Sequence, residues 1–196
     1  MRFHYQGRFS GDEADLPQRD PLPAGAVAFR EPDSTTTTAL VANGIALALL
    51  IPLGALVIWR SGGMDFSDFT ITLGILLSLV FAIPHEFLHA IWFREDVYLY
   101  TNLRQGMLFV VGSEDMTKGR FIILSLFPAI VLGIIPLVIF LINPSLKLLG
   151  YFGLFSFISA SGDFINVFNA LTQMPAGALT FLHGYHSYWY LPTAQA

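Results

Sequence analysis

The composition and charge pattern of the sequence predict an all-α membrane protein with about four transmembrane helices and one short β-hairpin. Of its 196 residues, 54% are hydrophobic and only 12% are charged, whereas about a quarter of the residues in a soluble domain are charged. The mean hydropathy is positive. The charges gather in short stretches between long apolar runs, as expected when apolar helices cross lipid and polar loops join them.

Four apolar runs have the length of about 20 residues that a helix needs to cross a bilayer. The second run follows Ser67 and Asp68, either of which can cap a helix. Pro84 predicts a kink in the second span, and Pro128 and Pro136 predict one in the third, because proline cannot donate the helical hydrogen bond. The predicted spans are residues 39–59, 68–93, 120–142 and 146–171.

Polar segments surround these spans. Residues 1–35 are rich in Pro, Asp, Arg and Gly, which predicts a polar arm that is solvent-exposed or loosely packed and that Phe3, Tyr5 and Phe9 could anchor. Residues 36–196 predict a single membrane domain. Between the second and third spans, residues 97–100 and 107–111 are rich in apolar and aromatic side chains and flank a turn over residues 102–106. This pattern predicts a short β-hairpin in that loop.

The distribution of Lys and Arg predicts the orientation of the chain. The arm and the loop after the second span hold four of these residues each, against one in each of the other two loops. By the positive-inside rule both termini and the hairpin are cytoplasmic, in a multi-pass protein surrounded by membrane lipid. The net charge is only −4 and the basic residues are scattered, so nothing supports a nucleic-acid partner. The four-residue sets are Arg2, Arg8, Arg19 and Arg30, and Arg94, Arg104, Lys118 and Arg120.

One motif in the second span predicts chemistry. Its residues are His85-Glu86-Phe87-Leu88-His89. Two His four residues apart lie on the same face of a helix, where both imidazoles can reach one metal ion. This is the arrangement in which two His bind zinc and the Glu acts as a general base toward a water molecule on the metal. The chain has no cysteine, so His and carboxylate groups are the expected ligands of one Zn²⁺ per chain.

Catalytic zinc needs a third protein ligand, and Asp163 is the candidate. It is the acidic residue inside the fourth predicted span, where a carboxylate without a partner would be costly. At 1.5 Å per residue, His85 lies about 27 Å beyond Ser67 and Asp163 about 24 Å beyond Lys147, so the two sites are predicted at similar depth. The alternatives are that the His-Glu-His cluster joins helices by hydrogen bonds and that Asp163 hydrogen-bonds a neighbouring helix.

Four further polar residues are candidates for binding substrate or for supporting the site. Asn166 and Asn169 follow Asp163 at intervals of three and could orient a substrate backbone or stabilise an oxyanion, or could instead bond between helices. His183 and His186 lie in an aromatic tail that is typical of a membrane interface. Either could approach the metal or close the site.

The sequence resembles a family of bacterial membrane proteins of unknown function that is described as putative zincin peptidases. The resemblance covers about residues 83–190. It rests on the His-Glu-Phe-Leu-His motif, on Lys118-Gly119-Arg120-Phe121 at the start of a span, and on Ser161-Gly162-Asp163. The layout also resembles the intramembrane site-2 proteases, in which two His and a later Asp bind zinc, although Asp163 is followed by Phe164 rather than by Gly.

These observations together predict a zinc-dependent metallopeptidase embedded in the membrane, with a membrane-associated peptide or protein as its substrate. His85, His89 and Asp163 would bind zinc and Glu86 would be the base. The predicted hairpin could hold an unwound substrate by strand addition, or be purely structural. The alternative function is a non-catalytic metal-binding membrane protein, such as a sensor, an assembly factor or a transporter accessory.

Overall fold

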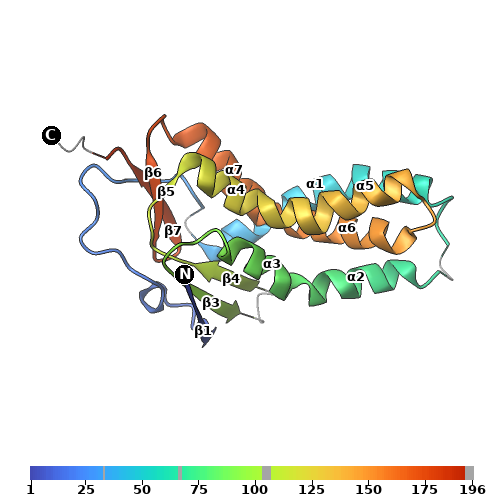
Figure 1. Ribbon diagram of the computed structural model, residues 1–196, viewed down its shortest axis with the longest axis horizontal. Coiled ribbons are helices and arrows are strands. Elements are labelled where there is room, and N and C mark those ends of the chain that lie inside the picture. The colour runs from blue at the N-terminus through green and yellow to red at the C-terminus, as the bar shows by residue number, and fades with distance from the viewer. Residues whose placement is uncertain (33, 66–67, 103–106, 193–196) are drawn as a thin grey trace. The chain divides into compact units, whose positions relative to one another are not determined.

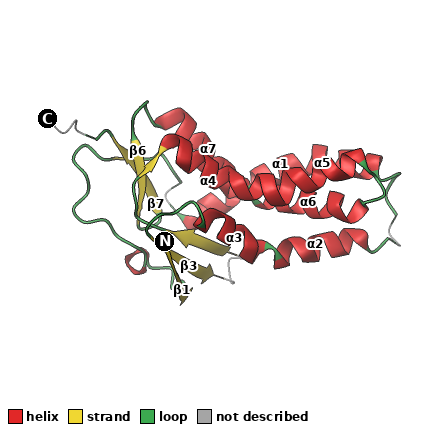
Figure 2. Cartoon of the chain, in the orientation of Figure 1, coloured by secondary structure: helices red, strands yellow, loops and turns green. Residues whose placement is uncertain are grey.

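The structure is a computed structural model, and it describes residues 1–32, 34–65, 68–102 and 107–192 (Figure 1). Helices predominate, and strands occupy a smaller share of the chain (Figure 2). The expectation of an all-α protein with one hairpin is therefore wrong in part, because the described chain contains two sheets. The helical elements are α1 (Thr35–Arg60), α2 (Thr70–Val80), α3 (Ala82–Ala90), α4 (Lys118–Pro128), the π-helix η2 (Ala129–Ile134), α5 (Ile135–Ile142), α6 (Lys147–Ser159) and α7 (Ser161–Gln173).

Two to four helices are apolar enough to span a membrane. Thr36–Arg60 and Lys118–Ile142 each meet the required length and hydropathy alone. The other two predicted spans are bent pairs: α2 and α3 meet at 41°, and α6 and α7 at 50°. If each bent pair is one span, the described chain has up to four spans, which is the number that the sequence predicts.

Each bend has a local cause. Pro84 lies in the first turn of α3, and proline cannot donate a hydrogen bond to the carbonyl four residues before it, which here is that of Val80 at the end of α2. The second bend falls where Ser159 and Ser161 flank Ala160 and Gly162 follows; such Ser and Gly pairs are common sites of helix kinks.

Proline also explains the π-helix in the third span. Pro136 cannot bond the carbonyl of Leu132, and the amide of Ile135 instead bonds Ile130, five residues earlier. The kink that the sequence predicts from Pro136 is thus a local widening of the helix. Helix α2 begins after Phe69, which makes no side-chain cap, so Asp68 is not the N-cap residue itself. Asp68 accepts bonds from the amide and hydroxyl of Thr70, the first residue of α2, at 2.9 and 2.6 Å. These bonds hold the pKa of Asp68 at about 2. The alternative cap, Ser67, lies outside the described residues.

The chain divides into two compact units, and the division falls inside α3, α4 and α7. The first unit comprises residues 1–31, 86–125 and 166–196, and the second comprises residues 32–85 and 126–165. The described part of the second unit is helical. Its core contains the buried residues Val57, Phe140, Tyr151 and Leu154.

Small residues let the helices of the second unit approach closely, as they do in membrane helix bundles. A β-carbon at Gly74 of α2 would lie 2.6 Å from the β-carbon of Tyr151 in α6. A β-carbon at Gly153 of α6 would lie 2.8 Å from both the carbonyl oxygen of Gly133 and the amide nitrogen of Leu137. Helix α6 therefore packs closely against α2 through Gly74, and against η2 and α5 through Gly153.

The first unit contains all of the described strands, and they form two sheets. In the first sheet, β1 (Arg2–Arg8) pairs in parallel with β3 (Asp96–Asn102), which pairs antiparallel with β4 (Met107–Val111). The predicted hairpin is confirmed as β3 and β4, while its turn over residues 103–106 lies outside the described residues. The order of the second sheet is β2-β7-β6-β5, and its strands are β2 (Val27–Ala28), β7 (His186–Tyr190), β6 (Leu179–His183) and β5 (Met116–Thr117).

The N-terminal residues are more firmly packed than the exposed or loosely packed arm that the sequence predicts. Besides β1 and β2, they supply the side chains of Phe9, Leu16 and Phe29, which are only 4%, 3% and 6% exposed. Phe9 and Leu16 pack with Tyr100 of β3 and Val111 just at the end of β4. Residues 1–31 are thus an integral part of the first unit.

The contact of Gly153 with two backbones yields a stability prediction. Gly153→Ala should destabilise the protein by about 1–3 kcal/mol, because the helices must move apart to admit a methyl group. Gly44→Ala in α1 is the matched control, since a β-carbon there meets nothing within 4 Å and Ala is favoured over Gly in a helix by about 1 kcal/mol. Thermal unfolding in detergent measures both, and equal stability of the two variants would refute the close packing.

Candidate metal centre

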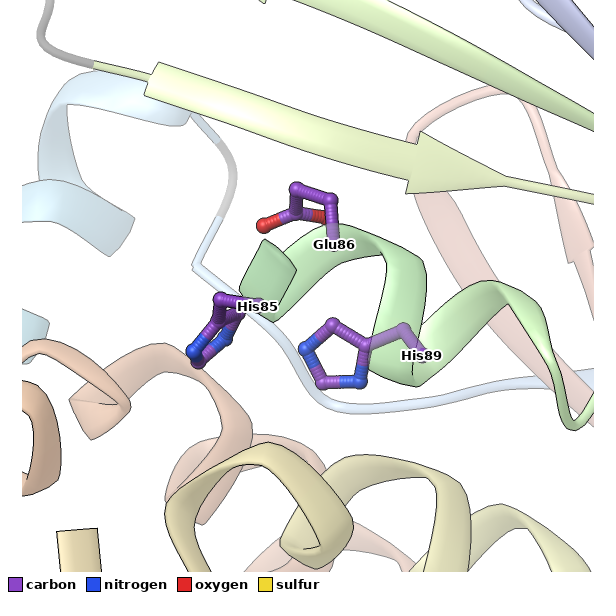
Figure 3. Close-up of side chains that lie close together, drawn as sticks. All are labelled: His85, Glu86 and His89. Atoms are coloured by element: carbon purple, nitrogen blue, oxygen red, sulfur yellow. The ribbon is translucent and has the colours of Figure 1, made fainter. Parts of the chain in front are cut away.

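Helix α3 brings three potential metal ligands together. One ligand atom from each of His85, Glu86 and His89 lies within 4.8 Å of the others. Figure 3 shows both imidazole rings on one side of the helix, as the spacing of four residues predicts. Glu86 and His89 are buried, with 8% and 5% of their surface exposed. The donor set of two imidazoles and a carboxylate nearby suits zinc.

Glu86 is oriented by a strand of the first sheet. Its Oε2 accepts a hydrogen bond of 3.0 Å from the backbone amide of Val110 in β4, and Figure 3 shows the carboxylate on the side of α3 that faces this strand. Charge-assisted bonds of this kind are among the stronger ones in proteins. The bond fixes one carboxylate oxygen, so that the side chain has a defined direction beside the two His.

His89 is oriented by helix α4. Its Nδ1 lies 2.9 Å from the carbonyl oxygen of Leu124. A carbonyl only accepts hydrogen bonds, so Nδ1 is the nitrogen that carries the proton. In a neutral imidazole the lone pair is then on Nε2, the arrangement that is usual for metal-binding His.

His85 lies next to Asp163, the carboxylate that the sequence selects as the third ligand. The distance between His85 Nε2 and Asp163 Oδ2 is 3.2 Å, and both side chains are largely buried, at 14% and 16% exposure. Two ligands at about 2.0–2.1 Å from a tetrahedral zinc are about 3.3 Å apart. The observed separation therefore fits a shared metal ion, and it equally fits a direct hydrogen bond between the two side chains.

The two Asn candidates lie further along α7. Asn166 is half-buried. Asn169 is buried, and its Oδ1 accepts a bond of 3.0 Å from Gln173 in the next turn. Its Nδ2 is also buried and has no hydrogen-bond partner among the described residues. The bond to Gln173 lies within α7 rather than between helices.

The two His candidates of the tail contact the N-terminal segment instead. His183 in β6 places Nδ1 3.1 Å from the backbone nitrogen and oxygen of Arg19. His186 in β7 lies between two carboxylates, 3.6 Å from Glu13 and 3.5 Å from Glu31. Burial raises the pKa of Glu31. These contacts tie the tail to residues 13–31.

Two contributors to the site could not be found from residue types. They are the backbone amide of Val110 and the backbone carbonyl of Leu124. Every residue carries such groups, so no pattern in the sequence marks them. The sequence predicted only the elements that contain them, the hairpin for Val110 and the third span for Leu124.

A His-Glu-x-x-His helix whose Glu and second His are buried, in a chain of apolar helices, fits a metallopeptidase of the zincin class. The comparison with protein families agrees with this class: residues 78–179, just over half of the chain, match the model of the family described as "Putative zincin peptidase". The chain belongs to this family, as the resemblance in its sequence predicts. No curated protein and no solved structure matches the chain.

The cluster on α3 predicts a specific effect of zinc on stability. At a zinc concentration 100 times the Kd, binding should stabilise the folded protein by about 2.7 kcal/mol, and a chelator should remove this gain. His85→Ala and His89→Ala should each abolish most of the rise in Tm. His4→Ala is the control, because His4 lies in β1 and contacts Asp96 rather than the motif. An equal rise in all four proteins would mean that zinc binds elsewhere.

Proposed function

We propose that the protein is a zinc-dependent metallopeptidase embedded in the membrane, which cleaves a membrane-associated peptide or a transmembrane segment of another protein. The observation that supports this best is the cluster of His85, Glu86 and His89 on one helix. That helix continues from α2, and together the pair is apolar enough to be a broken span. Such ionisable residues in an apolar span are usually functional.

In this proposal His85, His89 and Asp163 hold the metal. Bound zinc would supply polarisation of the scissile carbonyl and activation of water. Glu86 accepts the proton of that water and later delivers it to the leaving amine. The amide of Val110 holds Oε2 of Glu86, which directs the carboxylate while its other oxygen takes the proton. Leu124 fixes the ring of His89 through Nδ1.

The same proposal includes a multi-pass topology with both termini in the cytoplasm. Its support is the number of apolar helices, up to four with the two bent pairs. The excess of Lys and Arg in the N-terminal segment, in the loop between α3 and α4 and in the first turn of α4 supports it as well. An even number of spans puts both ends of the chain on one side.

Strand β4 is the proposed site at which an unwound substrate binds. The order β1-β3-β4 puts β4 at an edge of its sheet among the described strands. The amide of Val110 bonds Glu86 rather than β3, so the open edge of β4 faces the motif. Because amides alternate in direction along an antiparallel strand, the backbone of Leu108 points to the same edge. An extended peptide could pair there beside the metal.

The alternative is a non-catalytic metal-binding membrane protein. A structural zinc site usually has four closed protein ligands. His183 and His186 were the candidates for a fourth ligand, and they contact Arg19, Glu13 and Glu31 instead. These contacts favour the enzyme.

Glu86→Gln tests the proposed base. Hydrolysis should fall at least about 100-fold, because general base catalysis contributes 10²–10⁴, while zinc content stays at the wild-type level. Glu95→Gln, a change of an exposed Glu six residues after the motif, should leave activity unchanged. Cleavage of a membrane-anchored reporter peptide by purified protein measures both variants. Undiminished hydrolysis by Glu86→Gln would exclude Glu86 as the base.

Leu108→Pro tests the edge of β4. Proline removes the amide at that position, which points away from β3, so substrate pairing should weaken and KM should rise while zinc stays bound. Phe109→Pro is the comparison variant, because Phe109 is paired with Tyr100 of β3. It should break the sheet itself and lower stability as well. Kinetics of the reporter peptide and thermal unfolding separate the two effects. An unchanged KM in Leu108→Pro would count against strand addition at β4.

A further inference from the structure

Helix α4 begins with two basic residues, Lys118 and Arg120, and its described first turn holds no acidic residue. This is contrary to the usual preference, because the N-terminal end of a helix carries a partial positive charge that disfavours cations. Local sequence rules that are broken in this way often mark a position with another role. Both side chains here bind backbone carbonyl groups of other segments.

Lys118 binds the C-terminal end of α7. Its Nζ donates to the carbonyl oxygens of Met174 at 2.9 Å and of Leu171 at 3.2 Å. The last carbonyls of a helix have no partner within the helix and carry a partial negative charge, so a Lys is well suited to them. Helix α7 is the one that carries Asp163 in its first turn.

Arg120 binds the turn that follows α3. Its Nε donates to the carbonyl oxygen of Trp92 at 2.8 Å, and its second guanidinium nitrogen contacts both Trp92 and Glu114. Trp92 lies two residues beyond the end of α3, and its amide bonds the carbonyl of His89. The Arg is thus one hydrogen-bonded turn away from a proposed metal ligand.

Glu114 holds the same turn from the other side. It is 5% exposed, and its Oε2 accepts the amides of Arg94 at 2.8 Å and Glu95 at 2.6 Å. The close approach of this segment is visible at Gly112, where a β-carbon would lie 2.5 Å from the ring of Phe93. Arg120 and Glu114 together therefore immobilise residues 92–95.

We propose that Lys118 and Arg120 are positioning residues of the metal centre. Each fixes the end of one of the two helices that carry the proposed ligands, and the same helix α4 offers the carbonyl of Leu124 to His89. Because α3 and α7 are continuous, holding their ends limits how far their ligands can turn or slide. The inference rests on the proposed function, and it gives the Lys-Gly-Arg sequence at the start of α4 a structural role.

Cobalt binding to the purified full-length protein tests this inference. Co²⁺ in place of zinc gives visible absorption bands that report the geometry of its ligands. Lys118→Gln and Arg120→Gln should each weaken cobalt affinity about 10-fold, the lower end of the range for groups that orient metal ligands, and should change the band shape. Lys118→Arg keeps a donor and should restore both.

Arg60→Gln is the matched control. Arg60 donates to the carbonyl oxygen of Leu141 at 3.0 and 2.9 Å, so it also binds the last turn of a helix, α5. Neither α1 nor α5 carries a proposed ligand. This variant should lose stability to a similar degree and keep wild-type cobalt affinity and bands. Wild-type affinity and bands in both Lys118→Gln and Arg120→Gln would overturn the inference.

Hydrogen exchange of the metal-free protein separates this inference from the proposed function. In Arg120→Gln the amides near His89, and in Lys118→Gln those at the end of α7, should exchange about 10-fold faster than in Arg60→Gln. If the wild-type protein binds no cobalt, the proposed function fails. Exchange rates then still decide whether the two basic residues hold α3 and α7, and unchanged rates would refute that they do.

Discussion

The structure depends on how three polar side chains are satisfied in a mostly apolar chain. A buried polar group without a partner costs several kcal/mol in an apolar environment, and each residue of the motif has a partner. His85 contacts Asp163, Glu86 accepts from Val110, and His89 contacts Leu124. These partners come from α7, β4 and α4, so the motif helix is held by elements from distant parts of the sequence.

Two of those three partners are backbone groups, and a sheet supplies one of them. The amide of Val110 can point at Glu86 only because β4 is held in register by β3. Strand β3 is in turn covered by β1 from the N-terminal segment. The sheet therefore positions the general base that we propose, in addition to offering an edge for substrate.

The grouping of His85 with His89, the proximity of Asp163 and the β3–β4 hairpin were predictable from the sequence, while the rest of the two sheets was not. The spacing of His85 and His89 depends on one helix, and the depth of Asp163 depends on helix rise, so both follow from local geometry. The two sheets instead depend on pairing between residues far apart in the chain, such as Arg2 with Asp96. A polar, Pro-rich segment gives no local sign of such partners, and this is why residues 1–35 read as an exposed or loosely packed arm.

The central claim is that His85, His89 and Asp163 form one zinc site, and it is supported by the 3.2 Å separation of His85 and Asp163. Elemental analysis of the detergent-purified protein, wild type beside Asp163→Ala, tests it most directly. The account predicts one zinc per chain in the wild type and a lost or weakened metal in the variant. A wild-type protein without metal, even after zinc is supplied, would contradict it and leave the motif as a set of helix-joining hydrogen bonds.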